Sequence, residues 1–494
     1  MTALKLIDSS AVIGSGIIEG NLNFMGQYSE CIGNSADIII DKQLHKFNSQ
    51  YCTLNIDFFN NQSLHPLIGI CFPQSCNSND LQTIFQSSLN STNKWIQSLV
   101  AFSLYTNTRQ LVTVGNQSIN TINCFHGLRV ISLIIVITYH TIDAYTTNSS
   151  NSIEIIPMYS SIAMQFILNG MLWIDIFFLL SGFLCAYSVL REVKQTSVRK
   201  YAGNILWKII HRYIRLTPSV LAIIGFSLLV EVMSSSPFWF IFVDNNKSCL
   251  KNWWKTILYL TNIQFNNNNE KCLGHTWYLS ADMQMFIVSP IFIILLTCND
   301  IRKQYLGIAI NILAIIASWT ISAHILAKNE STSTADFRFF IKDVKIIDYL
   351  FASYCRIPAY CIGILMAYIY NKFGKLNINW TTNILLWILC IVINLVNILS
   401  TYFWFSGYSY HNFGFLLYGT ISHTVWSICW AYMLYACAIG QGGIVNRVLS
   451  WSALIPLSRL SYQGYLIQSV LIFIILASLP LPSYSNSINL VIIC

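Results

Sequence analysis

An arginine and a histidine, Arg129 and His140, stand inside one long apolar segment, CFHGLRVISLIIVITYHTIDAY. Eleven residues are almost three helical turns, so both side chains fall within about 20° of one helix face, roughly 16 Å apart along the axis. Ionisable groups are costly at membrane depth and usually face the protein interior or a water-filled path. A neutral histidine is well suited to take a proton from a hydroxyl near pH 7. The pair therefore predicts a buried site with His140 as a general base.

Three further charged residues extend this predicted site. Asp143 follows His140 by one turn and is expected to orient the imidazole ring or to hold an acceptor. Arg212 and Arg215, in HRYIRLTP, share a helix face, and guanidinium pairs suit bidentate binding of phosphate. The alternative for the two arginines is an ordinary anchoring role at the cytosolic edge of a membrane helix.

Two motifs in other apolar segments carry polar residues with an open role. CLGHTWYLSADMQMF holds His275 and Asp282 and enters its span from the outer side. These two are possible acceptor-side residues, or they brace the outer mouth of the helix bundle. RLSYQGYLIQ places Tyr465 and Gln468 in one polar stripe, where hydrogen bonding between helices is the expected role.

The motif DIFFLLSGF combines a carboxylate with two small residues, Ser181 and Gly182. Small residues let another helix approach closely. Ser181 is not expected to be a nucleophile, because the spacing supplies no histidine or aspartate partner. Asp175 is expected to be a structural group near a helix end.

The composition identifies an integral membrane protein. The chain is 54% hydrophobic and 10% charged with a mean hydropathy of +0.54, whereas about 25% of residues are charged in ordinary soluble domains. The net charge of +8 is explained by basic cytoplasmic loops, so no nucleic-acid partner is expected. Membrane lipids are the expected surroundings, at the endoplasmic reticulum or the plasma membrane.

Apolar segments long enough to span a bilayer recur through residues 124–494. We place nine of them near 128–147, 166–190, 216–234, 279–297, 305–327, 350–370, 380–401, 413–437 and 455–477. A tenth begins at Ile488 and stops at Cys494. The fold class is therefore an all-α polytopic membrane protein with about ten transmembrane helices, the last one truncated, preceded by a small disulfide-containing domain.

The distribution of basic residues predicts the orientation. Residues 191–215 hold seven lysines and arginines, which places that segment in the cytosol. Alternation then places 235–276 outside, together with Cys249, Cys272 and a glycosylation sequon at Asn246. We expect a Cys249–Cys272 disulfide in that compartment.

Residues 1–90 form a separate polar, Asn/Ser-rich region without a spanning segment. It holds four cysteines and two sequons, which favours an extracytoplasmic domain with a disulfide framework. These residues are Cys31, Cys52, Cys71, Cys76, Asn61 and Asn90. Three disulfide pairings are possible, and the alternative is free thiols with chance sequons. A zinc site is disfavoured, because no second half-site has matching spacing.

An outer N-terminal domain and a cytosolic start of the first span conflict unless another span lies between them. The linker, residues 91–123, offers only WIQSLVAFSLY, which is too short. The start, MTALKLIDSS, has no secretory signal, and the chain stops inside its last apolar segment. We therefore expect the sequence to be incomplete at its start, around residues 85–100, and at its end.

Together these motifs resemble the acyltransferase-3 membrane family, and within it the animal "nose resistant to fluoxetine" branch. The resemblance covers nearly the whole chain. It rests on GICFPQSC in the N-terminal region and, in the core, on CFHGLR with the following histidine, DIFFLLSG, HRYIRLTP, CLGHTWYLSADMQMF, YCRIPAYCIGILMAY and LSRLSYQGYLIQ.

The resemblance implies about ten spanning helices and the transfer of an acyl group from cytosolic acyl-CoA to an acceptor at or across the membrane. Arg129 and His140 match the family's Arg–His pair, and Arg212 and Arg215 its Arg-x-x-Arg pair, tied to donor binding. Many microbial members carry an acidic residue at the position of Asp282. Acyl-CoA is then a cosubstrate, and no tightly bound cofactor or metal is expected; the acceptor is unknown.

The main alternative is a transporter or lipid-handling membrane protein without chemistry, in which the same buried polar residues form a proton relay or solute path. Inverted repeats would favour it, and the two halves show none. A degenerate acyltransferase acting as a receptor is the third reading, and loss of the Arg–His pair would mark it.

Overall fold

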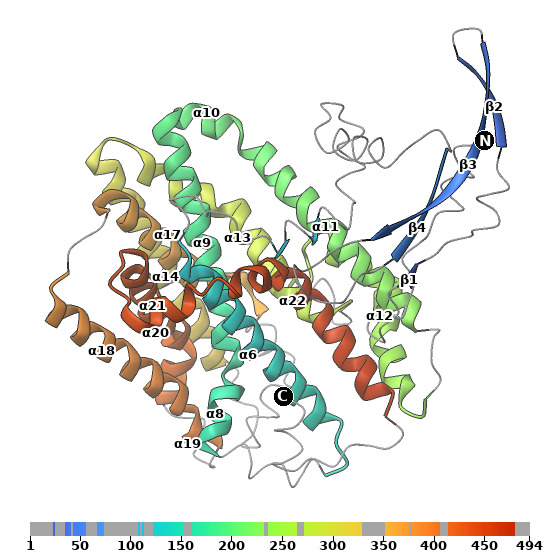
Figure 1. Ribbon diagram of the computed structural model, residues 1–494. Coiled ribbons are helices and arrows are strands. Elements are labelled where there is room, and N and C mark those ends of the chain that lie inside the picture. The colour runs from blue at the N-terminus through green and yellow to red at the C-terminus, as the bar shows by residue number, and fades with distance from the viewer. Residues whose placement is uncertain are drawn as a thin grey trace. The chain divides into compact units, whose positions relative to one another are not determined.

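The computed structural model describes the helical region almost throughout and the N-terminal region in part. The described residues are 23–24, 35–40, 43–55, 67–73, 107–108, 111–112, 122–151, 161–231, 236–263, 271–328, 351–374, 378–405 and 413–479. The chain divides into two compact units, Met1–Val112 and Thr113–Cys494, and each is described by itself. Figure 1 shows the elements of both units.

The N-terminal unit contains a four-stranded sheet in the order β1-β4-β3-β2. The strands are β1 (Asn23–Phe24), β2 (Ser35–Ile40), β3 (Gln43–Asn55) and β4 (Leu67–Pro73). β1 pairs with β4 in parallel, and the other two pairings are antiparallel. The register pairs Cys52 with Ile70 and Tyr51 with Cys71.

The sequence analysis did not predict this sheet; its all-α expectation is met by the helical second unit. The short apolar runs SADIII and LIGICFP are rich in isoleucine, which fits a pleated surface, but the sequence analysis considered them only as too short to span. Cys31 and Cys76, the sequons at Asn61 and Asn90 and most of the linker lie outside the described residues. The disulfide pairing in this unit therefore stays a prediction.

The second unit is helical. Its α-helices are α6 (Cys124–Thr147), α8 (Ile162–Leu168), α9 (Gly170–Gln195), α10 (Val198–Gly203), α11 (Ile205–Val230), α12 (Trp239–Ile257), α13 (Trp277–Ile293), α14 (Ile301–Lys328), α17 (Ser353–Phe373), α18 (Trp380–Leu399), α19 (Thr401–Phe405), α20 (Phe413–Ala438), α21 (Gly443–Leu449) and α22 (Leu454–Ala477). Two 3₁₀ turns, η1 (Gly274–Thr276) and η2 (Ile294–Thr297), flank α13.

Nine long helices of the described chain occupy the nine segments that the sequence predicts as spans. Seven of them are long and apolar enough to cross a membrane, and the bent pair α20–α21 would make an eighth. The remaining helix, α17, is the more polar one, and most of its residues, Arg356 included, are buried against other helices. The tenth predicted span lies outside the described residues, so the count of ten stays a prediction.

The core forms where α9 and α17 cross. A Cβ added at Gly182 would lie 2.2 Å from the carbonyl oxygen of Tyr360, and one at Gly363 would lie 2.2 Å from that of Leu179. The two backbones therefore touch directly, as the small residues of DIFFLLSGF predicted. Around this crossing, Phe178, Leu179 and Phe183 are fully buried.

We expect Gly182→Ala to destabilise the bundle, because the new methyl group has no space unless α9 and α17 move apart. Overpacking of this kind costs about 1–3 kcal/mol or more. Thermal unfolding of the purified protein in detergent measures the loss. Gly225→Ala is the matched control, because a Cβ there meets nothing within 4 Å. Equal melting temperatures of the two variants would contradict the packing.

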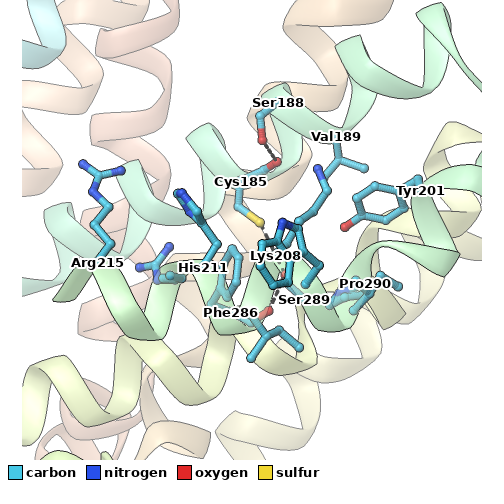
Figure 2. A pocket seen from close by; sticks show the side chains of 14 residues that line it. Cys185, Ser188, Val189, Tyr201, Lys208, His211, Arg215, Phe286, Ser289 and Pro290 are labelled. Atoms are coloured by element: carbon cyan, nitrogen blue, oxygen red, sulfur yellow. Dashed lines mark hydrogen bonds between the residues drawn. The ribbon is translucent and has the colours of Figure 1, made fainter. Parts of the chain in front are cut away.

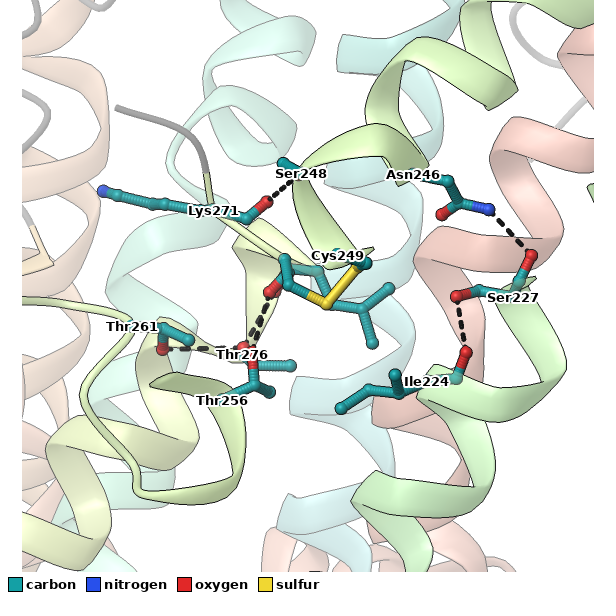
Figure 3. Close-up of a disulfide and its surroundings, with 11 residues drawn as sticks. Ile224, Ser227, Asn246, Ser248, Cys249, Thr256, Thr261, Lys271 and Thr276 are labelled. Carbon is teal, nitrogen blue, oxygen red and sulfur yellow. Dashed lines mark hydrogen bonds between the residues drawn. A yellow bond between two sulfur atoms is a disulfide. The ribbon is translucent and has the colours of Figure 1, made fainter. Parts of the chain in front are cut away.

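The predicted outer loop, residues 235–276, contains the helix α12, which the sequence analysis did not predict. Cys249 of this helix forms a disulfide with Cys272, the pair expected from the sequence (Figure 3). Asn246 is a correction: its side chain is buried, and its Nδ2 atom donates a hydrogen bond to the Ser227 carbonyl at 2.7 Å. The folded protein therefore does not present this sequon for glycosylation.

Candidate functional site

A pocket of about 310 Å³ lies between α9, α10, α11 and α13, and we call it the basic pocket (Figure 2). Its lining residues are Cys185, Ser188, Val189, Tyr201, Ile205, Trp207, Lys208, Ile209, His211, Arg212, Arg215, Phe286, Ser289 and Pro290. The basic side chains all come from α11. The pocket lies next to the segment 191–215, so the predicted orientation places it on the cytosolic side.

The helical repeat of α11 explains this gathering of charge. Lys208, Arg212 and Arg215 follow one another at spacings of four and three residues, which places them on one helix face. Lys208 forms an ion pair with Glu192 of α9, which fixes the pocket wall. Arg215 is exposed at the rim. Burial raises the pKa of the Tyr201 hydroxyl, so this group stays a hydrogen-bond donor at neutral pH.

Arg212 reaches from the basic pocket into the bundle. It forms an ion pair with Asp282 of α13, and its guanidinium carbon lies 4.3 Å from the centroid of the Phe286 ring. The sequence analysis offered Asp282 as a possible acceptor-side residue or a brace of the outer mouth, and the structure pairs it with Arg212; its role stays a prediction. Among the described residues, Arg212 Nε and Asp282 Oδ1 have no hydrogen-bond partner. Both groups therefore keep polar capacity toward a ligand.

Three arginines from three helices converge near the basic pocket. Arg129 of α6 lies close enough to Arg215 to repel it electrostatically. Two hydrogen bonds hold α22 against α6 and α11 near these arginines. His126 Nδ1 of α6 contacts the Ser458 hydroxyl at 3.0 Å, and the Tyr462 hydroxyl donates to the Leu216 carbonyl of α11 at 3.0 Å.

Arg459 lies on the turn of α22 between these two contacts and is exposed. It interacts electrostatically with His126, which also interacts with Arg129. Arg129, Arg215 and Arg459 therefore present positive charge from α6, α11 and α22 at one end of the bundle. Such a cluster suits an anion with several phosphate groups.

His140 lies farther along α6, in a second polar cluster formed with α22 and the start of α13. The Gln468 side chain lies beside His140, and its amide nitrogen and oxygen make no hydrogen bond of standard geometry with any described residue. His140 Nδ1 also has no such partner among the described residues. Gln468 is only 4% exposed. His140 and Gln468 therefore form a polar pair between α6 and α22 inside the bundle.

His275 completes the second cluster. It interacts electrostatically with His140 and contacts the Leu466 carbonyl through Nε2 at 3.1 Å. The Tyr465 hydroxyl donates a hydrogen bond to the backbone oxygen of His275. The structure thus brings His275 to His140 and Asp282 to Arg212, and an acceptor-side role of either residue stays a prediction.

Tyr278 links the two clusters. It interacts electrostatically with Arg129, Arg212 and Asp282 on one side and with Tyr465 on the other. Its ring centroid lies 5.4 Å from that of Tyr465. Buried polar side chains therefore follow one another from the basic pocket to His140. The sequence analysis missed this link because it singled out only His275 and Asp282 in the motif CLGHTWYLSADMQMF and gave Tyr278 no role.

Asp143 lies one turn beyond His140, and its residue is exposed. Its proposed role in orienting the imidazole ring stays a prediction. Within the described ranges, no group of three or more His, Cys, Asp or Glu side chains is arranged to hold a metal ion.

A third charged cluster was not predicted. Arg356 of α17 forms an ion pair with Asp175 of α9 at 3.2 Å, and His423 of α20 contacts both. The side chains of Asp175 and Arg356 are 0% and 1% exposed. The signal was present in the sequence, since Arg356 and His423 are ionisable residues within apolar segments. Both ring nitrogens of His423 contact Arg356, so this cluster joins three helices rather than offering a free base.

Comparison with known proteins supplies the family. A family model described as "Acyltransferase domain" matches residues 122–494, which include the basic pocket and the His140 cluster. The chain belongs to the acyltransferase-3 family. A second model, described as "Nose resistant-to-fluoxetine protein, N-terminal domain", matches residues 1–85. Both matches confirm the resemblance that the motifs indicated.

Two relatives in Caenorhabditis elegans extend this acyltransferase-3 assignment. The chain is 22% identical to "Nose resistant to fluoxetine protein 6" over an alignment that covers 97% of this chain and 73% of the relative. It is 26% identical to "Regulator of hypoxia-inducible factor 1" over 41% of this chain and 40% of that relative. No solved structure matches the chain. The protein is thus an integral membrane protein of an acyltransferase family.

Proposed function

We propose that this protein transfers an acyl group from cytosolic acyl-CoA to a hydroxyl of a lipid, a glycan or another acceptor at or across the membrane. The observation that carries the proposal is the buried polar connection between the basic pocket and His140. One end offers positive charge for a phosphate-bearing donor, and the other offers a base without a hydrogen-bond partner on Nδ1 among the described residues. The family match supports acyl transfer as the reaction class.

The donor is held through its phosphates. Arg212 and Arg215 line the basic pocket, and Arg129 and Arg459 stand beside it. Guanidinium groups bind phosphate in bidentate fashion, so four of them suit the several phosphates of CoA. The flexible arm of CoA then carries the thioester along the polar connection toward His140, over the roughly 16 Å that separates His140 from Arg129 on α6.

The chemistry uses His140 as a general base and then as a general acid. The imidazole takes the proton of the acceptor hydroxyl while the hydroxyl oxygen attacks the thioester carbonyl carbon. Arg129 stays at the donor end, about 16 Å from His140 along α6, where it binds the donor phosphates. The carbon–sulfur bond then breaks, the ester product forms, and the leaving CoA thiolate takes the proton back from the imidazolium. Gln468 and His275 hold the acceptor hydroxyl beside His140.

We expect Arg459→Gln to weaken donor use without affecting the chemical step. Loss of one charged hydrogen bond to phosphate, about 1.5–3 kcal/mol, raises the KM for acyl-CoA about 10- to 100-fold while kcat changes little. Steady-state kinetics over a range of acyl-CoA concentrations measure both constants. Arg447→Gln, an exposed arginine on α21, is the control. An unchanged KM in Arg459→Gln would remove this residue from the donor site.

The experiment that tests the function supplies radiolabelled acetyl-CoA and longer acyl-CoAs to membranes that contain the full chain or its His140→Ala variant. Label in a lipid, sterol, glycan or protein fraction, present only with His140 intact, supports the proposal and names the acceptor class.

We propose the endoplasmic reticulum or the plasma membrane as the location, with the N-terminal unit outside the cytosol.

The alternative function is a transporter or lipid-handling protein without catalysis. The polar connection from the basic pocket through Tyr278 to His140 supports a transporter as well as it supports an acyltransferase. A path for protons or solutes also needs buried polar groups that lie one after another in space. Absence of acyl transfer from every donor, together with movement of a solute or lipid that depends on His140, would favour this function.

A further inference from the structure

The helix α12 carries an exposed apolar face although it is not one of the candidate spans. Phe240, Leu250, Trp253 and Trp254 all lie on this face, and Leu250 is 63% exposed. At 100° per residue Leu250, Val243, Trp254 and Phe240 fall within a sector of about 80°, with Lys247 between Trp254 and Phe240 and with Trp253 at the border of the buried side. Four large exposed hydrophobic residues on one short helix form an apolar patch of the kind that marks an interaction site for a membrane or another protein.

A row of lysines borders this apolar face. Lys247, Lys251 and Lys255 follow at intervals of four residues, so they form one stripe along α12. Lys247 pairs with Asp244 at 2.6 Å, which is the only acidic residue of the helix. Lys255 lies 5.8 Å from the ring centroid of Trp254. The helix therefore has the pattern of an interfacial helix, with aromatic residues on one side and basic residues beside them.

The buried side of α12, which carries Phe242, Asn246 and Cys249, is fixed to the helical unit (Figure 3). Trp239 and Phe242 pack against Val470 and Ala477 of α22. The Cys249–Cys272 disulfide and the hydrogen bond from Ser248 to the Lys271 carbonyl at 2.9 Å tie the helix to the chain before η1. Because these contacts prevent rotation of α12, its apolar face is held outward.

We propose that α12 is a membrane-interface helix that binds phospholipid of the extracytoplasmic leaflet. The apolar face enters the boundary between headgroups and acyl chains, and the lysine stripe contacts the lipid phosphates. A phospholipid layer fits because α12 packs against the candidate span α11, whose Leu229 is also exposed, and because three lysines against one aspartate complement phosphate. The side of the membrane follows from the predicted orientation; the helix's role is independent of acyl transfer.

Photocrosslinking of the full chain in vesicles tests this proposal. A benzoylphenylalanine replaces either Trp254, on the apolar face, or Asn252, on the side of the helix away from that face and from the lysine stripe, with Leu250 as a second reporter position on the apolar face. The vesicles contain phosphatidylcholine with a radiolabelled photoinert tracer. Labelled lipid attached to the protein from positions 254 and 250, well above that from position 252, is the expected result.

The proposal is overturned if positions 254 and 250 attach no more lipid than position 252, or if they crosslink mainly to residues 1–112 or to a second copy of the chain. The lysine stripe has its own measurement: with phosphatidylglycerol added, Lys251→Gln should lower the share of anionic lipid among the crosslinked lipid about fivefold. An unchanged share would remove the lysines from the lipid contact. Arg447→Gln on α21 controls for a general change in charge.

Discussion

His140→Gln is expected to lower kcat/KM for acyl transfer about 10²–10⁴-fold, the range that a positioned general base contributes. The residue stands beside Gln468 and His275 at the end of the polar connection. The imidazole of His275 already contacts the Leu466 carbonyl through Nε2, so His140 is the base expected to take the acceptor proton. The loss should fall on kcat rather than on the KM for acyl-CoA, because the donor phosphates bind at the other end.

The control for this variant is His324→Gln, since His324 is exposed on α14 and far along the chain from both clusters. Binding of CoA to His140→Gln shows that the variant is folded. Activity of the His140 variant equal to that of His324→Gln, with CoA binding retained, would contradict the general-base role.

Arg356→Met is expected to cause the largest loss of stability. Arg356 and Asp175 are buried in the core, where removal of one partner leaves an uncompensated charge and costs about 3–5 kcal/mol. The predicted result is a protein that yields little folded material in detergent and unfolds at a much lower temperature. Thermal unfolding followed by size-exclusion chromatography measures both effects.

The double variant Asp175→Asn with Arg356→Met should regain part of the stability, because it removes the orphaned carboxylate. Lys194→Met is a matched control, since Lys194 lies in an exposed contact with Asn371 at the helix end. If Arg356→Met melted with the control, or if the double variant were no more stable than the single one, the cluster would not hold α9, α17 and α20 together.

The sequence predicted the long helices well because each has a simple one-dimensional signal. A run of some twenty apolar residues must form a helix in a bilayer, so α6, α14 and α22 begin and end within a few residues of the predicted spans. The sequence also predicted that another helix approaches closely at Gly182. It did not predict that this helix is α17.

Contacts between helices could not be predicted, because the sequence indicates how deep a residue lies in the membrane but not which helices are neighbours in the bundle. Asp282 enters its span from the predicted outer side and Arg212 from the cytosolic side, yet the two meet in an ion pair. The cluster of Asp175, Arg356 and His423 escaped for the same reason, since each residue stands alone in its own apolar segment. The helix α12 was missed because an amphipathic pattern inside a polar loop lacks the continuous hydrophobicity of a span.

One measurement tests the central claim most directly: acyl transfer by the purified full chain in sealed vesicles, with radiolabelled acyl-CoA supplied to one face only. The account predicts labelled ester product when acyl-CoA reaches the face that carries the basic pocket, with no product from His140→Gln. Absence of product from either face, with protein that is folded and binds CoA, would contradict an acyltransferase and favour the transporter.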